Sequence, residues 1–313
     1  MKYGKYHFFC VMKNDAYLPQ YKGSTFRGVF GRALKKVVCA LKQQECSQCL
    51  LKQRCIYALA FETSISLKNT PQSSRIASPP HPFVLEPPLT TKTKFSKGDL
   101  LDFNLLLFGE MNNSLPYFIY AFDQMGKIGI GKKNEGKRGR FILKEVKGNN
   151  CVIYAATDKK MHNITKPEVL SIDNTTCTVE PKACLKLTLK TPLRLKFENR
   201  LKADLPFHVL VRSMLRRISS LFNCYGKGEP PLDYRGLVQR AASVKTFDSN
   251  LKWFDWCRYS SRQNKSMLMG GMTGSVTYKG NIAEYLPVVE LCEKVHLGKQ
   301  TSFGLGQIRA ESM

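Results

Sequence analysis

The stretch VHLGKQTSFGLGQI, residues 295–308, combines three glycines, two hydroxyl side chains, a lysine and a histidine. An apolar segment, Tyr285–Val295, precedes it, and a short apolar run follows it. Glycine lets backbone N–H groups turn toward a ligand without a side chain in the way, and a nearby lysine adds the charge that a phosphate site needs. The alternative is a tight turn between a helix and a strand, which is the commoner meaning of a lone Gly-x-Gly pattern.

The first half of the chain contains a counterpart of this stretch. Leu115–Met125 is expected to be a helix, with Ser114 as its N-cap and Gly126 as its end. A basic loop follows it, with the pattern Gly-Ile-Gly at 129–131 and several lysines. Both this helix and the one before the first stretch open with the dipeptide Leu-Pro.

Each half of the chain therefore has the order strand, basic helix, strands, helix, glycine loop and strand. This is the βαββαβ order of a ferredoxin-like fold, given twice. We predict an α+β protein made of two tandem ferredoxin-like (RRM-like) domains, residues 1–178 and 179–313. A four-stranded sheet of this type is a common RNA-binding scaffold, although a fold alone does not assign a function.

Local patterns place the other elements. Lys5–Met12 is aromatic and β-prone, and Thr25–Leu41 carries an apolar stripe at helical spacing behind Ser24, which suits an N-cap. A second amphipathic helix is expected at Leu205–Phe222 and a hairpin turn at Ser266–Gly271. Further strands are expected at Leu100–Phe108, Phe141–Val146, Val152–Ala156, Ala183–Leu195, Trp253–Tyr259 and Gly274–Tyr278.

The charge balance indicates a polyanionic partner. The chain has 49 Lys and Arg against 24 Asp and Glu, a formal net charge of +25. Nucleic acid is favoured over a membrane, because no run of 18 apolar residues could span a bilayer. The N-terminus does not resemble a signal peptide, and 11 cysteines without an export signal favour a reducing cytoplasm, where they are thiols or metal ligands.

Four of the cysteines are clustered. Cys39, Cys46, Cys49 and Cys55 are separated by six, two and five residues, and the central Cys-x-x-Cys is a spacing that tetrahedral zinc accepts. Four thiolates would close the shell, so the metal would be structural. An iron–sulfur cluster is the alternative metal site, and four ordinary buried thiols are the alternative without metal.

The first predicted helix carries a row of basic residues off its apolar stripe: Arg27, Arg32, Lys35 and Lys36. A solvated basic face would explain them. Phosphate binding would explain them equally well, because two glycines and two hydroxyls surround Arg27 at a helix N-terminus.

Several motifs, taken together and in order, carry a resemblance that spans almost the whole chain. They are residues 23–31 (GSTFRGVFG), the four cysteines with Tyr57 and Phe61–Glu62, the tripeptide at 81–83 (HPF), the loop at 129–131, residues 258–263 (RYSSRQ) followed by Gly270–Gly271, and residues 296–306. With these motifs the chain resembles the CRISPR precursor-RNA-processing endoribonucleases of the repeat-associated mysterious protein (RAMP) superfamily, in the subfamily with a four-cysteine insertion.

The resemblance implies cleavage within CRISPR repeats without a catalytic metal, as part of antiviral defence in the cytoplasm. The 2′-OH upstream of the scissile bond attacks the phosphate and leaves a 5′-OH and a 2′,3′-cyclic phosphate. The implied partners are CRISPR repeat RNA or crRNA and a multisubunit effector complex, with no membrane and no small-molecule substrate. Structural zinc would take no part in catalysis.

That reaction needs a base, an acid and cations that stabilise the phosphorane. Of the five histidines, His296 is the first candidate, because it adjoins the glycine loop and Lys299. The family often supplies its base near the first helix, where this chain has no histidine but offers Tyr17, Arg27 and Lys35 as further catalytic candidates. The expected RNA-binding residues are Arg32, Lys36, Lys132, Lys133, Arg258, Arg262, Gln263, Gly298, Lys299, Thr301, Ser302, Gly304 and Gly306.

Two other functions stay open at this point. A relative that binds the crRNA in an effector complex and cuts nothing would also lack a histidine near the first helix. A zinc-containing protein that binds DNA or tRNA would share the charge and the cysteines.

Overall fold

The computed structural model describes residues 1–42, 44–63, 79–162, 166–172, 184–195, 203–260 and 265–312. The chain divides into two compact units. The first unit is Met1–Val169 with Cys224–Gly226, and the second is Leu170–Asn223 with Lys227–Met313. In the part of the chain that is described, no helix is both long and apolar enough to cross a membrane.

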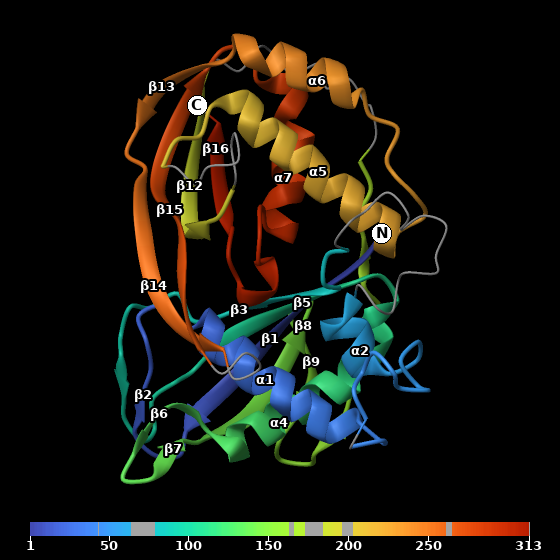
Figure 1. Ribbon diagram of the computed structural model, residues 1–313, viewed down its shortest axis with the longest axis vertical. Coiled ribbons are helices and arrows are strands. Elements are labelled where there is room, and N and C mark those ends of the chain that lie inside the picture. Colours follow the sequence, from blue (N-terminus) through green and yellow to red (C-terminus); the bar gives the residue numbers. More distant parts are fainter. Residues whose placement is uncertain are drawn as a thin grey trace. The chain divides into compact units, whose positions relative to one another are not determined.

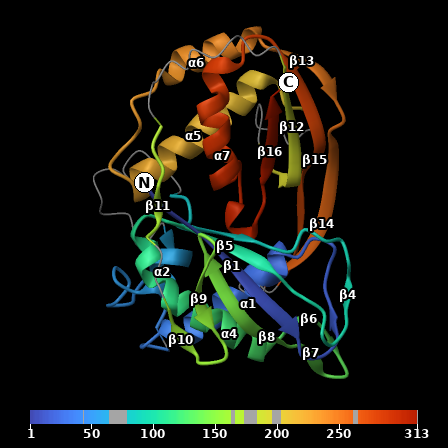
Figure 2. The same ribbon diagram turned by 180° about the vertical axis from the view of Figure 1, so that it is seen from behind.

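The first unit is an antiparallel sheet with the βαββαβ connectivity predicted from the sequence. Its strands lie in the order β8-β1-β5-β3, so the fourth strand of the motif lies beside the first and the third lies between the first and the second. β9 and β10 extend the sheet beyond β8, and β11 pairs with the start of β1 (Figure 2). The motif consists of β1 (Lys2–Met12), α1 (Gly23–Val38), β3 (Phe83–Glu86), β5 (Phe103–Phe108), α4 (Leu115–Ile128) and β8 (Phe141–Gly148), followed by β9 (Cys151–Ala155), β10 (Lys160–Met161) and β11 (Glu168–Val169).

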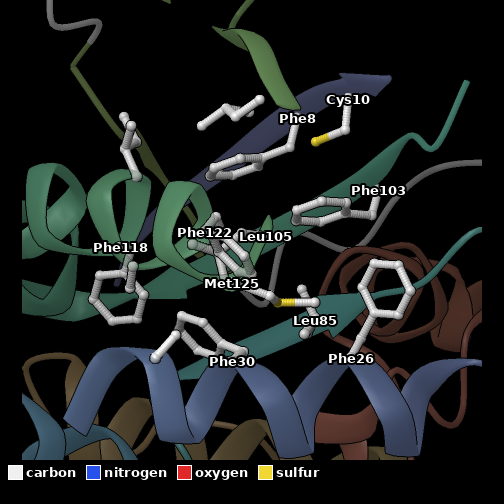
Figure 3. Packing of buried hydrophobic residues seen from close by; sticks show 14 of the residues in the cluster. Phe8, Cys10, Phe26, Phe30, Leu85, Phe103, Leu105, Phe118, Phe122 and Met125 are labelled. Atoms are coloured by element: carbon white, nitrogen blue, oxygen red, sulfur yellow. The ribbon is translucent and has the colours of Figure 1, made fainter. Parts of the chain in front are cut away.

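The core of this unit lies between the sheet and the two long helices. Alternate residues of β1 are buried, from Tyr6 to Met12, because successive side chains of a strand point to opposite faces. Phe30 of α1 stacks on Phe122 of α4 at 4.4 Å between ring centroids, and Phe8 of β1 lies 4.7 Å from Phe122 (Figure 3). Burying one such ring stabilises the fold by about 1.5–3 kcal/mol.

The ends of both long helices differ from the sequence prediction. The N-cap of α1 is Lys22, and Ser24 lies in the first turn, so the predicted Ser24 cap is wrong. The predicted stop of α4 at Gly126 is wrong as well, since the helix runs on to Ile128 and ends at Gly129, whose φ is 84°. Gly126 is needed inside the helix because a side chain there would collide with the Phe141 carbonyl.

Short elements surround the first unit's motif. α2 (Ile56–Phe61) packs against α1, and a 3-10 turn, η2 (Gly109–Ser114), precedes α4. Two small ribbons, β2–β4 and β6–β7, lie outside the main sheet. Their strands are β2 (Ala16–Tyr17), β4 (Lys94–Phe95), β6 (Ile130–Asn134) and β7 (Lys137–Gly139).

The second unit repeats the same connectivity. Its strands lie in the order β13-β15-β12-β16, and β14 also pairs with β15. Figure 1 shows α5 and α7 beside this sheet. The elements are β12 (Cys184–Leu193), α5 (Phe207–Tyr225), α6 (Tyr234–Arg240), η3 (Ala241–Ser243), β13 (Lys245–Ser249), β14 (Lys252–Ser260), β15 (Lys265–Lys279), η4 (Ala283–Tyr285), α7 (Leu286–Val295), η5 (Thr301–Phe303) and β16 (Ile308–Ser312).

The hairpin turn predicted at Ser266–Gly271 is wrong. These residues lie inside β15 and pair with β14 over the register from Lys252–Thr273 to Ser260–Lys265. Gly270 and Gly271 fit in the strand where neighbouring groups come close: a side chain at Gly270 would meet the Trp253 ring, and one at Gly271 would meet Pro192.

Candidate nucleic-acid interface

The glycine loop of the second unit follows a left-handed path. α7 ends at Val295, and the chain then passes through the short 3-10 helix η5. A side chain at Gly298 would meet the Arg194 carbonyl at 2.7 Å, and one at Gly306 would collide with the Leu297 carbonyl. The residues with positive φ are His296 (59°), Gly298 (84°), Gln300 (62°), Gly304 (80°) and Gly306 (73°).

The backbone of the loop is held by its own hydrogen bonds. Leu297 N donates to Gly306 O at 2.9 Å, Lys299 N to Arg194 O at 2.9 Å, and Gly306 N to Pro192 O at 3.0 Å. Further bonds are donated by the amides of Phe303, Gly304 and Gln307. The glycines therefore permit the path of the chain. The amides named here are already bonded within the protein, so the predicted phosphate contacts of the loop would fall to its other groups.

His296 lies inside this loop and not at its surface. Its side chain is fully buried, and its Nδ1 is 3.0 Å from the Leu305 carbonyl oxygen. Arg217 of α5, itself buried, donates to the His296 carbonyl at 3.2 Å and to the Val295 carbonyl at 2.8 Å. The proton-transfer role of His296 stays a prediction, and the burial of the ring and its contact with a carbonyl oxygen weigh against it. Its position favours a structural role.

Three buried polar atoms at the loop have no hydrogen-bond partner among the described residues: Gln300 Oε1, Ser302 Oγ and Arg258 Nε. Leaving a buried polar group unpaired costs about 1–3 kcal/mol, so such atoms are usually satisfied by a ligand or by water. Ser302 is 1% exposed. Their concentration on the glycine loop and the adjacent strand makes this part of the molecule a candidate site for a polar ligand or for ordered water.

Arg258 of β14 joins the strand to the loop. Its Cζ lies 4.7 Å from the centre of the Phe303 ring, and its Nη2 lies 3.6 Å from the Met267 sulfur. Burial lowers the pKa of the guanidinium, which nevertheless stays charged at neutral pH. An arginine held by a ring and a sulfur can bind a phosphate bidentately or stack on a base.

The basic residues of α1 in the first unit form two groups. The Arg27 Cζ lies 4.6 Å from the centre of the Phe61 ring and the Lys35 Nζ 5.5 Å from that of Tyr57, so both cations pack on α2. They are eight positions apart, which is about 12 Å along the helix. Arg32 lies apart from these two residues and near Arg138 instead. Burial and the charge of Arg138 lower the pKa of the Arg32 guanidinium.

The other predicted residues of the first unit lie at its surface. Lys36, Lys132 and Lys133 are exposed. Tyr17 is 37% exposed, and its carbonyl lies so close to Gly131 that a side chain there would collide with it. Tyr17 therefore adjoins the basic loop of this unit.

The predicted residues of the second unit are split between surface and interior. Lys299 is exposed, whereas Thr301, Ser302, Gly304 and Gly306 are buried. Arg262 and Gln263 lie outside the described residues.

The remaining histidines do not lie on the glycine loop. His81 Nδ1 is 2.8 Å from the Ala60 carbonyl oxygen, and His162 Nε2 is 2.9 Å from an Asp158 carboxylate oxygen. The centre of the His7 ring lies 4.0 Å from that of Phe9, with the two rings tilted by 34°, and His208 is half-buried in α5.

The four clustered cysteines lie around the connection between α1 and α2. Cys39 is the C-cap of α1, Cys55 is the N-cap of α2, and all four thiols are half-buried. Burial raises the pKa of Cys46, Lys35 opposes this, and the charges of Glu62, Cys55 and Cys39 add to it, so these groups lie near one another. Within the described residues, no three His, Cys, Asp or Glu side chains are grouped so that they could hold a metal ion.

Comparison with known proteins assigns both halves of the chain. Residues 1–169, more than half of the chain, match the family model AF_1859_N, described as an N-terminal domain. The chain belongs to the AF_1859_N family. Residues 187–308 match the model described as CRISPR-associated endoribonuclease Cas6, so the second half carries a Cas6-family domain. An uncharacterized protein of Archaeoglobus fulgidus is 25% identical over 300 residues, which cover 95% of this chain and 93% of that protein.

Solved structures share the fold. A Cas6 product complex aligns with a TM-score of 0.53 at 14% identity, covering 100% of this chain and 99% of the other. Thermus thermophilus Cas6 aligns with a TM-score of 0.52 at 13% identity, covering 99% and 98%. A partial Cas6-RT-Cas1–Cas2 complex aligns with a TM-score of 0.54 at 12% identity, and there this chain spans only 46% of the matched chain. These likenesses confirm the predicted fold of two ferredoxin-like units.

Two features of the interface were not predicted from the sequence. One is the burial of Arg217, which bonds the end of α7. Arg217 follows Met214 by three positions and precedes Leu221 by four, so it lies on the apolar stripe of α5, and this spacing could have indicated its burial. The contact between Arg258 and Phe303 joins residues 45 positions apart, and no local pattern indicates it.

Proposed function

We propose that the protein is an endoribonuclease that processes CRISPR precursor RNA by cutting within its repeats. One observation carries the proposal. The glycine loop, whose buried Gln300 Oε1 and Ser302 Oγ have no hydrogen-bond partner among the described residues, lies inside the segment that matches the Cas6 endoribonuclease family. The net charge of +25 suits a polyanionic substrate.

In the proposed reaction the 2′-oxygen attacks the adjacent phosphorus, the P–O5′ bond breaks, and no metal takes part. A base removes the 2′-OH proton, an acid supplies a proton to the leaving 5′-oxygen, and cations stabilise the charge of the phosphorane. The products are a 2′,3′-cyclic phosphate and a 5′-OH. Holding the attacking oxygen, phosphorus and leaving oxygen in line supplies much of the acceleration.

The proposed catalytic groups of this chain are Arg27, Lys35 and Tyr17. The two cations are held against aromatic rings of α2, which restricts their side chains and suits charge stabilisation. Tyr17 is exposed enough to exchange a proton with a substrate. His296 instead holds the glycine loop, and Arg258, Lys299 and Ser302 are assigned to the RNA.

Cleavage of the host's CRISPR repeat RNA by the purified full-length chain in EDTA tests this function. We expect one major cut, a cyclic phosphate on the upstream product, and full protection by a single 2′-deoxy substitution at the cut site. Cleavage that needs a divalent metal, or that survives the deoxy substitution, would show that the proposed mechanism is wrong.

A second candidate function is a crRNA-binding subunit that does not cut. The burial of His296 favours it, because the first candidate for proton transfer then does not lie at the solvent-exposed surface. Tight binding of the repeat RNA without cleavage, over a pH range from 6 to 9, would support this alternative over the nuclease.

We also propose that Cys39, Cys46, Cys49 and Cys55 bind a structural zinc ion, as in a four-cysteine insertion. Ligand type and chain spacing fit zinc, and the side chains would have to close from their present positions around the ion. Elemental analysis of the purified chain should give about one zinc per molecule, which a Cys46→Ser, Cys49→Ser double variant loses. An iron signal would identify an iron–sulfur cluster instead. If the wild-type protein contains no metal, the proposed metal site is wrong.

A further inference from the structure

The hairpin of β14 and β15 carries aromatic and cationic side chains on one face. Phe254, Trp256 and Arg258 occupy alternate positions of β14, so they project to the same side. Their partners on β15 are Gly271, Met269 and Met267. The two strands run side by side along their whole paired length (Figure 1).

These side chains and Phe303 of the glycine loop make two ring contacts along one line, and we call the set the β14 column: Phe254, Trp256, Arg258 and Phe303. The rings of Phe254 and Trp256 are stacked, with centroids 5.6 Å apart and an interplanar angle of 22°. The Arg258 guanidinium lies over the Phe303 ring at 4.7 Å, so the column ends on the glycine loop. The three residues of β14 are half-buried, which leaves part of each accessible.

The opposite face of the same strand is different in kind. Trp253 lies there and donates its indole N–H to the Asp255 carboxylate at 2.7 Å. A carboxylate on that face disfavours a polyanion, whereas the β14 column and its described cross-strand partners contain no acidic residue. The strand therefore presents one face suited to RNA and one that is not.

We propose that the β14 column is a stacking surface for the nucleobases of a single-stranded RNA segment beside the glycine loop. The proposal rests on the proposed function for its choice of RNA. Bases stack on aromatic rings with little sequence preference, and arginine planes add to the stack. Arg258 contributes a buried Nε that lacks a hydrogen-bond partner within the described part of the chain, and a phosphate or a base edge could supply one.

The chain's two tryptophans allow a direct test, because Trp256 lies on the column and Trp253 on the other face. The probe is a short single-stranded RNA of mixed sequence with 2′-O-methyl groups, which binds but cannot be cleaved by 2′-OH attack. In Trp253→Phe, only Trp256 reports, and we expect its fluorescence to be quenched on binding. In Trp256→Phe, only Trp253 reports, and we expect little change.

Affinity and an abasic probe complete the experiment. Trp256→Leu should weaken binding of the 2′-O-methyl RNA about ten-fold, whereas the matched Trp253→Leu should not. An abasic strand of the same length should not quench Trp256. Equal quenching by the abasic strand, or an unquenched Trp256 with bound RNA, would overturn the stacking surface.

The outcome is separable from that of the proposed function. Cleavage of repeat RNA without quenching of Trp256 would remove the stacking surface and leave the nuclease. Quenching of Trp256 in a protein that never cuts repeat RNA would keep the stacking surface and remove the nuclease.

Discussion

Lys22 shows how one side chain is constrained at the start of α1. It is fully buried, and its Nζ donates to the carbonyls of Gln20 at 3.1 Å and Thr90 at 2.5 Å. Burial lowers the pKa of Lys22 to about 8 from an ordinary value of 10.5. The amine therefore fixes the turn before the helix that carries Arg27 and Lys35.

This shift predicts a pH dependence of stability. Between pH 8 and pH 10.5 the unfolded chain keeps the Lys22 proton while the folded chain has lost it, so the contribution of Lys22 to the free energy of unfolding rises with pH. Denaturant unfolding of wild type and Lys22→Met at pH 7.5 and pH 9.5 measures it. The difference between the two proteins should shift in favour of wild type at the higher pH. The exposed Lys36→Met is the control, and a difference that falls with pH would contradict the prediction.

Arg217 is the residue on which the end of α7 depends. Arg217→Met would leave the carbonyls of Val295 and His296 without their donor, at a cost of about 1–3 kcal/mol for a buried unpaired group. We expect a lower free energy of unfolding together with weaker RNA binding. The neighbouring exposed Arg216→Met should leave stability nearly unchanged. Equal losses in both variants would mean that charge, not the carbonyl bonds, is responsible.

At the scale of the element, the glycine loop is a path that side chains would block. Gly306→Ala places a Cβ against the Leu297 carbonyl and requires a φ of 73°. We expect a loss of at least about 1–2 kcal/mol in the free energy of unfolding, measured by denaturant titration. Gly136→Ala, with a φ of 76° and nothing near its Cβ, isolates the cost of the backbone angle. A smaller loss at Gly306 than at Gly136 would contradict the steric explanation.

Periodicity predicted which elements form, and packing decided where they end. The stripes of Thr25–Leu41 and Leu205–Phe222 gave α1 and α5, because a helix buries one face whatever its partner is. Gly126 misled the prediction, since a close neighbour and not a helix end requires glycine there. Close neighbours also surround Gly270 and Gly271, where the predicted hairpin turn is wrong. The burial of His296 was not predicted for a related reason, because sequence adjacency to a loop does not say which way a ring points.

At the scale of the whole molecule, the net charge of +25 predicts how the proposed RNA binding depends on salt. A protein that holds four phosphates of a single strand should lose affinity about fifty-fold when salt rises from 50 to 200 mM, because bound counterions are released. A plot of log Kd against log salt measures the number of phosphates held. Lys299→Ala should lower the slope, whereas Trp256→Leu should lower the affinity and leave the slope unchanged. A slope near zero for wild type would exclude electrostatic binding of the strand.

The sequence was enough to predict that both halves share one connectivity. It was not enough to predict which side chains meet at the candidate site. The order of elements along the chain was enough for two ferredoxin-like units. The groups that matter at the site, such as Arg258 over Phe303 and Arg27 over Phe61, join residues far apart in sequence. Such contacts depend on the packed fold and leave no periodic trace in the sequence.

The internal hydrogen bonds of the glycine loop affect how binding energy is used. Because six of its amides are already bonded within the protein, the loop should lose little conformational entropy in the proposed binding of RNA. The free and bound loops should therefore superimpose, and weaker binding after loop mutations should reflect faster dissociation more than slower association. Adaptation to a different RNA would then come from exchanging the side chains the loop displays, while its backbone stays as it is.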